Sequence, residues 1–250
     1  MWNNVRQMNL AASALHAIFV LALLGAAGIY AIQRPEFRLC AIQIDGDTQH
    51  INSPTVRSTV IGHLKGNFFT VDLDTARGAF EQMPWVRHAS VRRVWSNALA
   101  VTLEEYKPLG TWGNYQLVSV DGDLFTANQG ELDDDLPAFD GPDGTAKEVV
   151  ARYHDFEKWF APLDAKPEEV TLSSRFAWTV KLSNGTQIEF GRERNQDTLH
   201  ERSERLVASW PAVTGRWGKE IEYADLRYPN GFAIRAAGMR FINDTDKAKK

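Results

Sequence analysis

The stretch Met83–Pro108, MPWVRHASVRRVWSNALAVTLEEYKP, decides the fold of this chain of 250 residues. Residues 86–95 and 98–106 are predicted to form two strands, joined by a tight turn at Ser96-Asn97. The second strand alternates in side-chain character with the period of a half-buried strand, Leu99, Val101 and Leu103 against Ala100, Thr102 and Glu104. The stretch carries no catalytic motif, so we interpret this hairpin as part of a docking module.

The elements predicted before the hairpin give the order β-α-α-β-β. A strand is predicted over Phe37–Asp45. A helix is expected to open with Ser53 as its N-cap, followed by proline at the first helical position, and to close at Gly66. A second helix is predicted to begin near Asp72 or Asp74. The domain built from these elements is predicted to span residues 36–107, with its helices on one face of a small sheet.

The N-terminal region indicates a membrane anchor. Leu10–Ile32 contains no Asp, Glu, Lys or Arg, and its 23 residues would span about 34 Å as a helix. A cleaved signal peptide is the alternative, but its apolar region is usually shorter, about 7–15 residues. We predict a transmembrane helix over residues 10–32, a cytoplasmic tail over 1–9 and the bulk outside the cytoplasm. Arg6 precedes the apolar run while Arg34 and Arg38 follow it, so the flanking charges leave the orientation open.

A second domain is predicted over residues 108–240, followed by a disordered tail over 241–250. Asp121-Gly122 and Asn184-Gly185 are strong hairpin signals. Thr145 and Glu148 have the spacing of a capping box, which predicts a helix. The pattern typical of a domain boundary falls at residues 108–113.

The end of this domain is predicted as a helix over residues 197–210 and a strand over 221–228, with 232–236 as the continuation of that strand. We therefore expect a mixed β-sheet with flanking helices. The fold class predicted for the whole chain is α+β.

Composition argues against several functions. Lys and Arg number 28 against 32 Asp and Glu, a net charge of −4, so the chain lacks a general basic field for nucleic acid. Cys40 is the single cysteine, so it forms no intrachain disulfide, and we predict it as a small core residue of a strand. The sequence Asp133–Asp135 is interpreted as a solvated acidic loop.

Known motifs of catalytic chemistry are missing from the sequence. It contains no H-E-x-x-H, G-x-S-x-G, P-loop or dinucleotide fingerprint. The six histidines lack metal-ligand spacing and are predicted at surface or half-buried positions. We predict no catalytic, cofactor or metal site, no cofactor and no enzymatic activity.

The hairpin also carries a short basic ribbon made of Arg87, Arg92 and Arg93. We interpret it as an exposed strand face, with contact to a lipid surface or an acidic partner as the alternative. Trp85 and Trp95 are predicted in the core.

Several motifs together resemble the FtsQ/DivIB family of bacterial division proteins. They follow the apolar anchor in the order NFFTVDLD (67–74), the hairpin of residues 83–108, TWG (111–113), FGRE (190–193) and DLRYPNGFAI (225–234). The resemblance covers nearly the whole chain. The chain departs from the family pattern in Met83 for leucine before Pro-Trp, in Ser96 for a frequent proline, and in Ala236-Ala237 where a tryptophan can occur.

The resemblance implies a POTRA domain followed by a C-terminal β domain. It further implies an essential-type scaffold of the divisome that links early and late division proteins and helps control septal wall synthesis. The β domain would bind FtsB, and through it FtsL, by adding a partner strand to an exposed sheet edge. The POTRA domain would recruit the protein through FtsK and other divisome proteins, and residues 86–93 are the candidate surface. The implied location is the inner membrane at the septum, single-pass, with a cytoplasmic N-terminus and a periplasmic bulk.

The resemblance also implies the partner-binding residues of the β domain. Arg227 would pair with an acidic partner residue and Tyr228 would pack on the partner. Asn230 and Gly231 would let its backbone approach, and Arg192 would add a second charged contact. From the sequence alone, an ordinary strand aromatic at Tyr228 and a purely turn-forming glycine at Gly231 remain alternatives.

Two other functions stay open at this level. One is a POTRA-containing factor for outer-membrane assembly, although such proteins usually carry several POTRA repeats or a barrel. The other is a membrane-anchored enzyme of unrecognised type.

Overall fold

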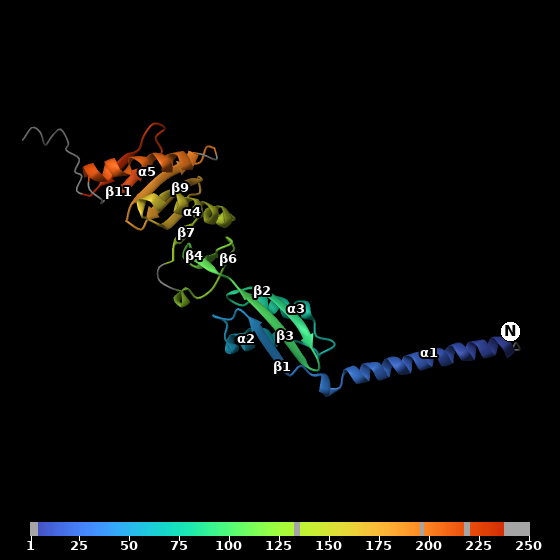
Figure 1. Cartoon of the computed structure of the whole chain (residues 1–250). Helices are drawn as coiled ribbons and strands as arrows, with labels where there is room; N and C mark the ends of the chain where they lie inside the picture. The colour runs from blue at the N-terminus through green and yellow to red at the C-terminus, as the bar shows by residue number, and fades with distance from the viewer. Residues whose placement is uncertain (1–4, 133–135, 196–197, 218–220, 238–250) are drawn as a thin grey trace, which may run out of the picture. The chain divides into compact units, whose positions relative to one another are not determined.

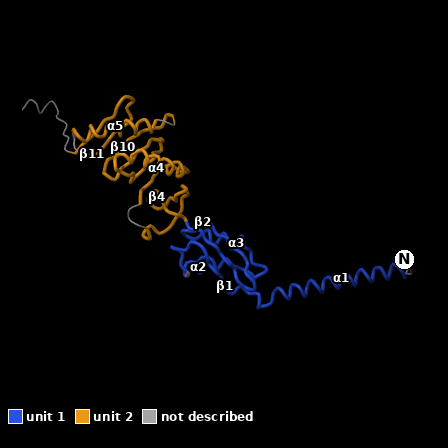
Figure 2. The backbone as a smooth tube through the Cα atoms, viewed as in Figure 1, with its two compact units in different colours: residues 1–105 blue, residues 106–250 orange. Residues whose placement is uncertain are grey.

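The computed structural model describes residues 5–132, 136–195, 198–217 and 221–237. The chain divides into two compact units, residues 1–105 and 106–250 (Figures 1 and 2). The predicted acidic loop at 133–135 and the predicted tail at 241–250 lie outside the described residues.

The chain opens with a long apolar helix, α1 (Val5–Ile32), which is exposed to solvent along its described length. Within the described ranges it is the one helix long and apolar enough to cross a membrane. Its described part begins at Val5, five residues before the predicted membrane-spanning segment, because the polar residues in its first turns are compatible with helical backbone. A single turn of 3-10 helix, η1 (Pro35–Phe37), follows it.

Unit 1 contains the predicted β-α-α-β-β arrangement, which confirms the α+β class for this part of the chain. Its elements are β1 (Ala41–Gly46), α2 (Ser53–Val60), η2 (Ile61–His63), α3 (Leu73–Glu81), β2 (Val86–Val94) and β3 (Ala98–Glu105). The sheet has the order β1-β3-β2, with β1 parallel and β2 antiparallel to β3. The core lies between the sheet and the two helices and includes Val60, Phe80 and Val101.

Local boundaries in the first half of unit 1 differ from the sequence prediction. The strand predicted from Phe37 begins at Ala41, because Pro35–Phe37 form the turn of η1. Cys40 therefore precedes the strand and is exposed, so its prediction as a core residue was wrong.

Helix α2 is capped one residue earlier than predicted. Asn52 has extended backbone and its side-chain oxygen accepts a hydrogen bond from the Thr55 N–H at 3.0 Å, whereas Ser53 is already helical. The helix ends at Val60 and passes into η2, so Gly66 does not cap it. Gly66 instead turns the following loop with a φ of 107°.

The two tryptophans of the hairpin have opposite surroundings. Trp85 is buried, as predicted, but Trp95 is 73% exposed, so its prediction as a core residue was wrong. The strand pairing ends at Val94 and Ala98, and Trp95 therefore lies in the turn beyond the part of the sheet that covers the core. Arg87, Arg92 and Arg93 are exposed on β2, as predicted.

Unit 2 is built on a mixed sheet of nine strands with the order β12-β11-β10-β9-β8-β7-β4-β5-β6 (Figure 1). The strands are β4 (Pro108–Trp112), β5 (Gln116–Ser119), β6 (Leu124–Phe125), β7 (Ala138–Asp140), β8 (Pro167–Leu172), β9 (Ala177–Leu182), β10 (Gln187–Arg192), β11 (Ile221–Asp225) and β12 (Ala233–Ala236). The helices are η3 (Gln129–Glu131), α4 (Ala146–Phe160), η4 (Ala161–Leu163) and α5 (Thr198–Trp217). This mixed sheet with helices confirms the predicted fold class.

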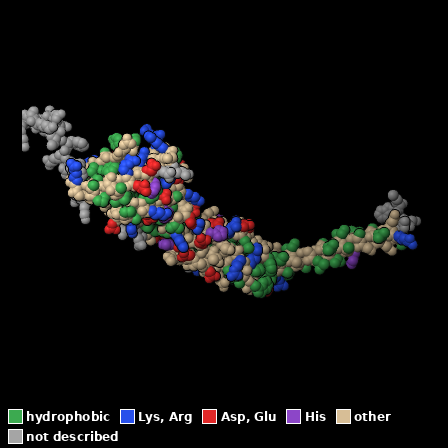
Figure 3. Space-filling view, turned by 45° about the horizontal axis from the view of Figure 1, so that its top comes forward, with side chains coloured by type: hydrophobic (Ala, Val, Ile, Leu, Met, Phe, Trp, Pro, Cys, Tyr) green, Lys and Arg blue, Asp and Glu red, His purple; other side chains and the backbone are tan. Residues whose placement is uncertain are grey.

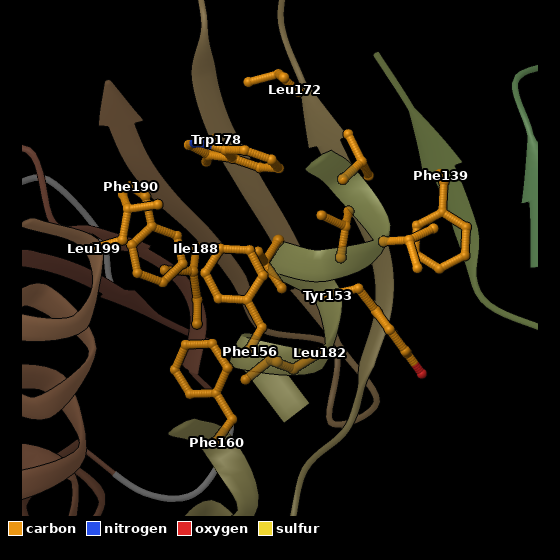
Figure 4. Close-up of a cluster of buried hydrophobic side chains, with 14 of the residues drawn as sticks. Phe139, Tyr153, Phe156, Phe160, Leu172, Trp178, Leu182, Ile188, Phe190 and Leu199 are labelled. Atoms are coloured by element: carbon orange, nitrogen blue, oxygen red, sulfur yellow. The ribbon is translucent and has the colours of Figure 1, made fainter. Parts of the chain in front are cut away.

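The core of unit 2 is aromatic. Helix α4 contributes Phe156 and Phe160, which lie against Trp178 of β9 and Phe190 of β10 (Figure 4). The ring centroids of Phe156 and Phe190 are 4.9 Å apart. Buried leucines of α5, Leu199 and Leu206, complete the same cluster.

Both hairpins predicted in unit 2 are present, but other elements correct the prediction. Strands β7 and β8 were missed, and so was β4, which lies in the segment interpreted as a domain boundary. The capping box is absent, because Thr145 Oγ1 donates to the Pro142 carbonyl at 2.7 Å instead of capping α4. Helix α5 runs through Pro211 to Trp217, beyond the predicted end at Trp210.

The last two strands also differ from the prediction. Strand β11 ends at Asp225 rather than at residue 228, and residues 233–236 do not continue it. They fold back as β12, antiparallel to β11, with Ala224 opposite Ile234.

Candidate partner-binding site

The last described strand, β12, forms one edge of the nine-stranded sheet. It pairs with β11 on its inner side, where Asp225 lies opposite Ala233. Within the described ranges no strand pairs with its outer side. An edge strand presents main-chain N–H and C=O groups on that side, which another extended segment can bind.

The connection that joins β11 to β12 holds four of the five residues expected to bind a partner, Arg227 among them. Tyr228, Asn230 and Gly231 lie in the turn of this connection, and the Tyr228 side chain is 56% exposed. Arg205 of α5 fixes the backbone of this turn, because its Nη1 donates to the carbonyls of Tyr228 at 3.2 Å and Gly231 at 3.4 Å. The exposed Tyr228 ring is therefore presented on an anchored backbone.

Gly231 has no evident need to be glycine within its own chain. A Cβ built at this position meets nothing within 4 Å, and its φ is outside the left-handed region. The turn itself therefore does not require glycine at this position.

Arg227 is held by an acidic residue of its own chain. Its Nε and Nη2 donate to the Asp225 carboxylate at 2.8 and 2.6 Å, and its backbone N–H adds a bond at 3.0 Å. The hydrogen bond from Arg227 holds the pKa of Asp225 below its usual range, and the same bond raises the pKa of Arg227. The guanidinium remains 58% exposed while the carboxylate is buried. Asp225 thus orients Arg227 and leaves part of it free for an outside acidic group.

Replacing Asp225 by asparagine is expected to destabilise unit 2 near neutral pH and to have little effect in acid. The folded pKa of Asp225 is lowered, so its stabilisation is present above the unfolded pKa of about 3.9 and is lost as pH falls through the folded pKa. The free energies of unfolding of wild type and Asp225→Asn, measured by urea titration at several pH values, should differ near neutral pH and converge as pH falls through the lowered pKa of Asp225. A constant difference at every pH would contradict this assignment.

Strand β10 supports Arg227 from the other side. Gly191 lies at a β-bulge with a φ of 73°, and a Cβ there would come within 2.9 Å of Arg227 Cγ. Glycine at this position therefore makes room for the Arg227 side chain. Arg192 follows directly and its side chain is exposed, so the structure places the two predicted arginines on neighbouring segments.

A buried arginine of α5 holds the end of β10. Arg202 donates to the Phe190 carbonyl and, at 3.3 Å, to the Arg192 carbonyl. Burial lowers its pKa. Sequence reasoning missed Arg202, Arg205 and Asp225. The three-residue spacing of the two arginines on α5, which places both on one helix face, was the available signal.

Residues of the kinds that bind metals do not cluster in the described part of the chain, where no group of three or more His, Cys, Asp or Glu could hold an ion. The arrangement is instead a sheet edge flanked by an exposed tyrosine and two exposed arginines. Such an arrangement can bind an extended acidic peptide.

Comparison with known proteins identifies the family. Residues 37–106 match the family described as "POTRA domain, FtsQ-type", and residues 110–227 match "Cell division protein FtsQ/DivIB, C-terminal". The Cell division protein FtsQ of Burkholderia pseudomallei is 77% identical over the full length of both chains. The chain belongs to the FtsQ/DivIB family. Further FtsQ relatives occur in Bordetella pertussis, 45% identical over 96% of this chain and 94% of the relative, and in Nitrosospira multiformis, 38% identical over 94% and 99%.

Membership of the FtsQ/DivIB family confirms the resemblance found in the sequence and makes this chain a cell division protein. It favours division over outer-membrane assembly, the alternative left open above. The N-terminal helix α1 fits a single-pass membrane protein of this family. The part of unit 1 that follows α1 is its FtsQ-type POTRA domain, matched over residues 37–106.

Proposed function

We propose that this FtsQ/DivIB protein is a non-enzymatic scaffold of the divisome that links early and late division proteins. It binds FtsB, and through it FtsL, by accepting an added strand at β12, and so helps control septal wall synthesis. The POTRA domain carries the contacts to FtsK and to other divisome proteins. The N-terminus lies in the cytoplasm and both units lie in the periplasm at the septum.

The observation that carries the proposal is the outer edge of β12, which is unpaired among the described residues, beside an anchored turn. The main chain of β12 supplies hydrogen bonds, and Tyr228 and Arg227 flank them with an aromatic face and a positive charge. The bonds from Arg205 hold the turn in place before a partner arrives, which reduces the ordering that binding requires.

The edge of β12 also has features that protect exposed strand edges of soluble proteins against unspecific aggregation. The strand has four residues, and Arg235 forms an ion pair with Glu222 at 3.1 Å on its exposed surface. Short, charged edges resist unspecific pairing. These features support a selective partner strand rather than general aggregation.

A photo-crosslinking residue placed at Tyr228 in dividing cells tests the proposal. We expect it to capture FtsB, a small single-pass protein, while the same probe at Tyr115 should not. Tyr115 is a suitable control because it is also an exposed tyrosine of unit 2. Capture of an outer-membrane protein at Tyr228, or equal capture of FtsB at both positions, would contradict the proposed interface.

A further inference from the structure

Aromatic side chains from three separate segments of unit 1 meet in one exposed patch. Phe37 belongs to η1, Phe69 to the loop before α3, and Trp95 to the turn between β2 and β3. The ring centroid of Phe37 lies 4.9 Å from that of Phe69 and 6.3 Å from that of Trp95. Trp95 is 73% exposed and Phe69 43% exposed. These three residues are called the aromatic patch below.

The aromatic patch is part of the folded unit rather than a chance meeting of loose loops. The Phe68 N–H donates to the Phe37 carbonyl at 2.8 Å, and the buried Phe68 ring lies 5.7 Å from Trp95. Arg93 of β2 donates to the carbonyls of Phe68 and Val71, both at 2.7 Å. The fold therefore fastens the three segments together and keeps large apolar rings at the surface. Such exposed patches commonly mark an interaction site.

The chain connection brings the patch close to the membrane. Phe37 is five residues beyond Ile32, the last residue of α1, and five extended residues reach at most about 18 Å. The polar zone on each side of a bilayer is about 5–8 Å thick. Whatever the tilt of α1, Phe37 therefore lies within about 18 Å of the end of that helix, which places it within reach of the headgroups. Tryptophan is enriched at that level, where its ring meets both apolar and polar surroundings.

The charge around the aromatic patch is opposite to that of the whole chain. Segments 33–38, 64–71 and 91–97 contain one acidic residue, Glu36, and five basic residues, Arg34, Arg38, Lys65, Arg92 and Arg93. The whole chain has a net charge of −4. Figure 3 shows hydrophobic side chains grouped on the surface of unit 1 with Lys or Arg side chains beside them. A basic rim around apolar rings suits anionic lipid headgroups.

We propose that the aromatic patch inserts into the headgroup region of the bilayer that α1 crosses, and that anionic lipids strengthen this contact. The POTRA domain is then held against the membrane surface at the end that carries Phe37, Phe69 and Trp95. This lipid contact goes beyond the scaffold function proposed above, and its test is independent of β12.

The test uses the full chain in lipid nanodiscs with a single spin label. Cys40→Ser removes the native thiol, and Ser96→Cys places the label beside the patch. Thr48→Cys is the matched control, because Thr48 is exposed beyond the opposite end of β1, about 15–20 Å away along the sheet. We expect the ratio of oxygen to nickel-complex collisions to be several-fold higher at Ser96 than at Thr48, and to rise when phosphatidylglycerol is added to phosphatidylcholine.

In the double variant Phe69→Ser, Trp95→Ser, the ratio of oxygen to nickel-complex collisions at position 96 should fall to the ratio measured at position 48. Both side chains are exposed, so the fold of unit 1 should be retained, and circular dichroism checks this. Equal water access at 96 and 48 in the wild-type background would overturn the proposal, as would protection that survives the double variant. Protection that appears only when other membrane proteins are added would assign the patch to a protein partner instead.

Discussion

A Tyr228→Lys variant is expected to lose at least about 30-fold in affinity for FtsB, because truncating a central aromatic anchor usually costs about 2 kcal/mol or more. Lysine keeps the side chain long but removes the flat apolar face that would pack on the partner. The carbonyl of Tyr228 still accepts its bond from Arg205, so the turn is retained. Affinity is measured by titrating the purified full chain with the periplasmic part of FtsB.

The control for this prediction is Tyr115→Lys, which makes the same chemical change at another exposed tyrosine of unit 2. It should bind with wild-type affinity. Both variants should have the same urea midpoint of unfolding as the wild type, since substitutions at exposed positions usually change stability by less than about 0.5 kcal/mol. If the Tyr228→Lys variant co-purifies with FtsB at wild-type yield, the interface lies elsewhere.

Phe156→Ala is expected to destabilise unit 2 by about 3–5 kcal/mol, the usual cost of emptying a core phenylalanine site. Phe156 is fully buried and its ring lies against Phe190 and Trp178, so its loss leaves a cavity between α4 and the sheet. Urea unfolding followed by tryptophan fluorescence should shift to a midpoint lower by about 2 M. Strand β10 also positions Gly191 beside Arg227, so the binding site depends on the folding of unit 2. Partner binding by the Phe156→Ala variant should therefore weaken only at urea concentrations close to its lowered unfolding midpoint.

Phe176→Ala provides the comparison, because it removes the same ring from a position that is 55% exposed in the same unit. A loss of less than about 0.5 kcal/mol is expected there. Similar losses for the two phenylalanines would mean that the aromatic cluster around Phe156 does not dominate the stability of unit 2.

Local signals in the sequence determined much of this protein. The alternation in residues 98–105 and the aspartate that caps α3 at Asp72 act within a few residues, so the order β-α-α-β-β follows from them. Asp121-Gly122 and Asn184-Gly185 determine two hairpins, β5–β6 and β9–β10, for the same reason. The apolar N-terminal run and the motifs of residues 67–113 and 190–234 sufficed to indicate a membrane helix and the FtsQ/DivIB family.

Only the tertiary structure decided where the edges and the exposed rings lie. Strand β7 has three residues and pairs in parallel with β4 and β8, which are both distant from it in the chain, so no local pattern marks it. The antiparallel return of β12 depends on its pairing with β11. The bonds from Arg205 to the turn depend on how α5 packs beside the sheet. Trp95 has a large apolar side chain of the kind found in cores, yet the strand pairing ends at Val94, before it. Sequence patterns report the period of a segment, whereas burial and edge position depend on which distant segments cover it.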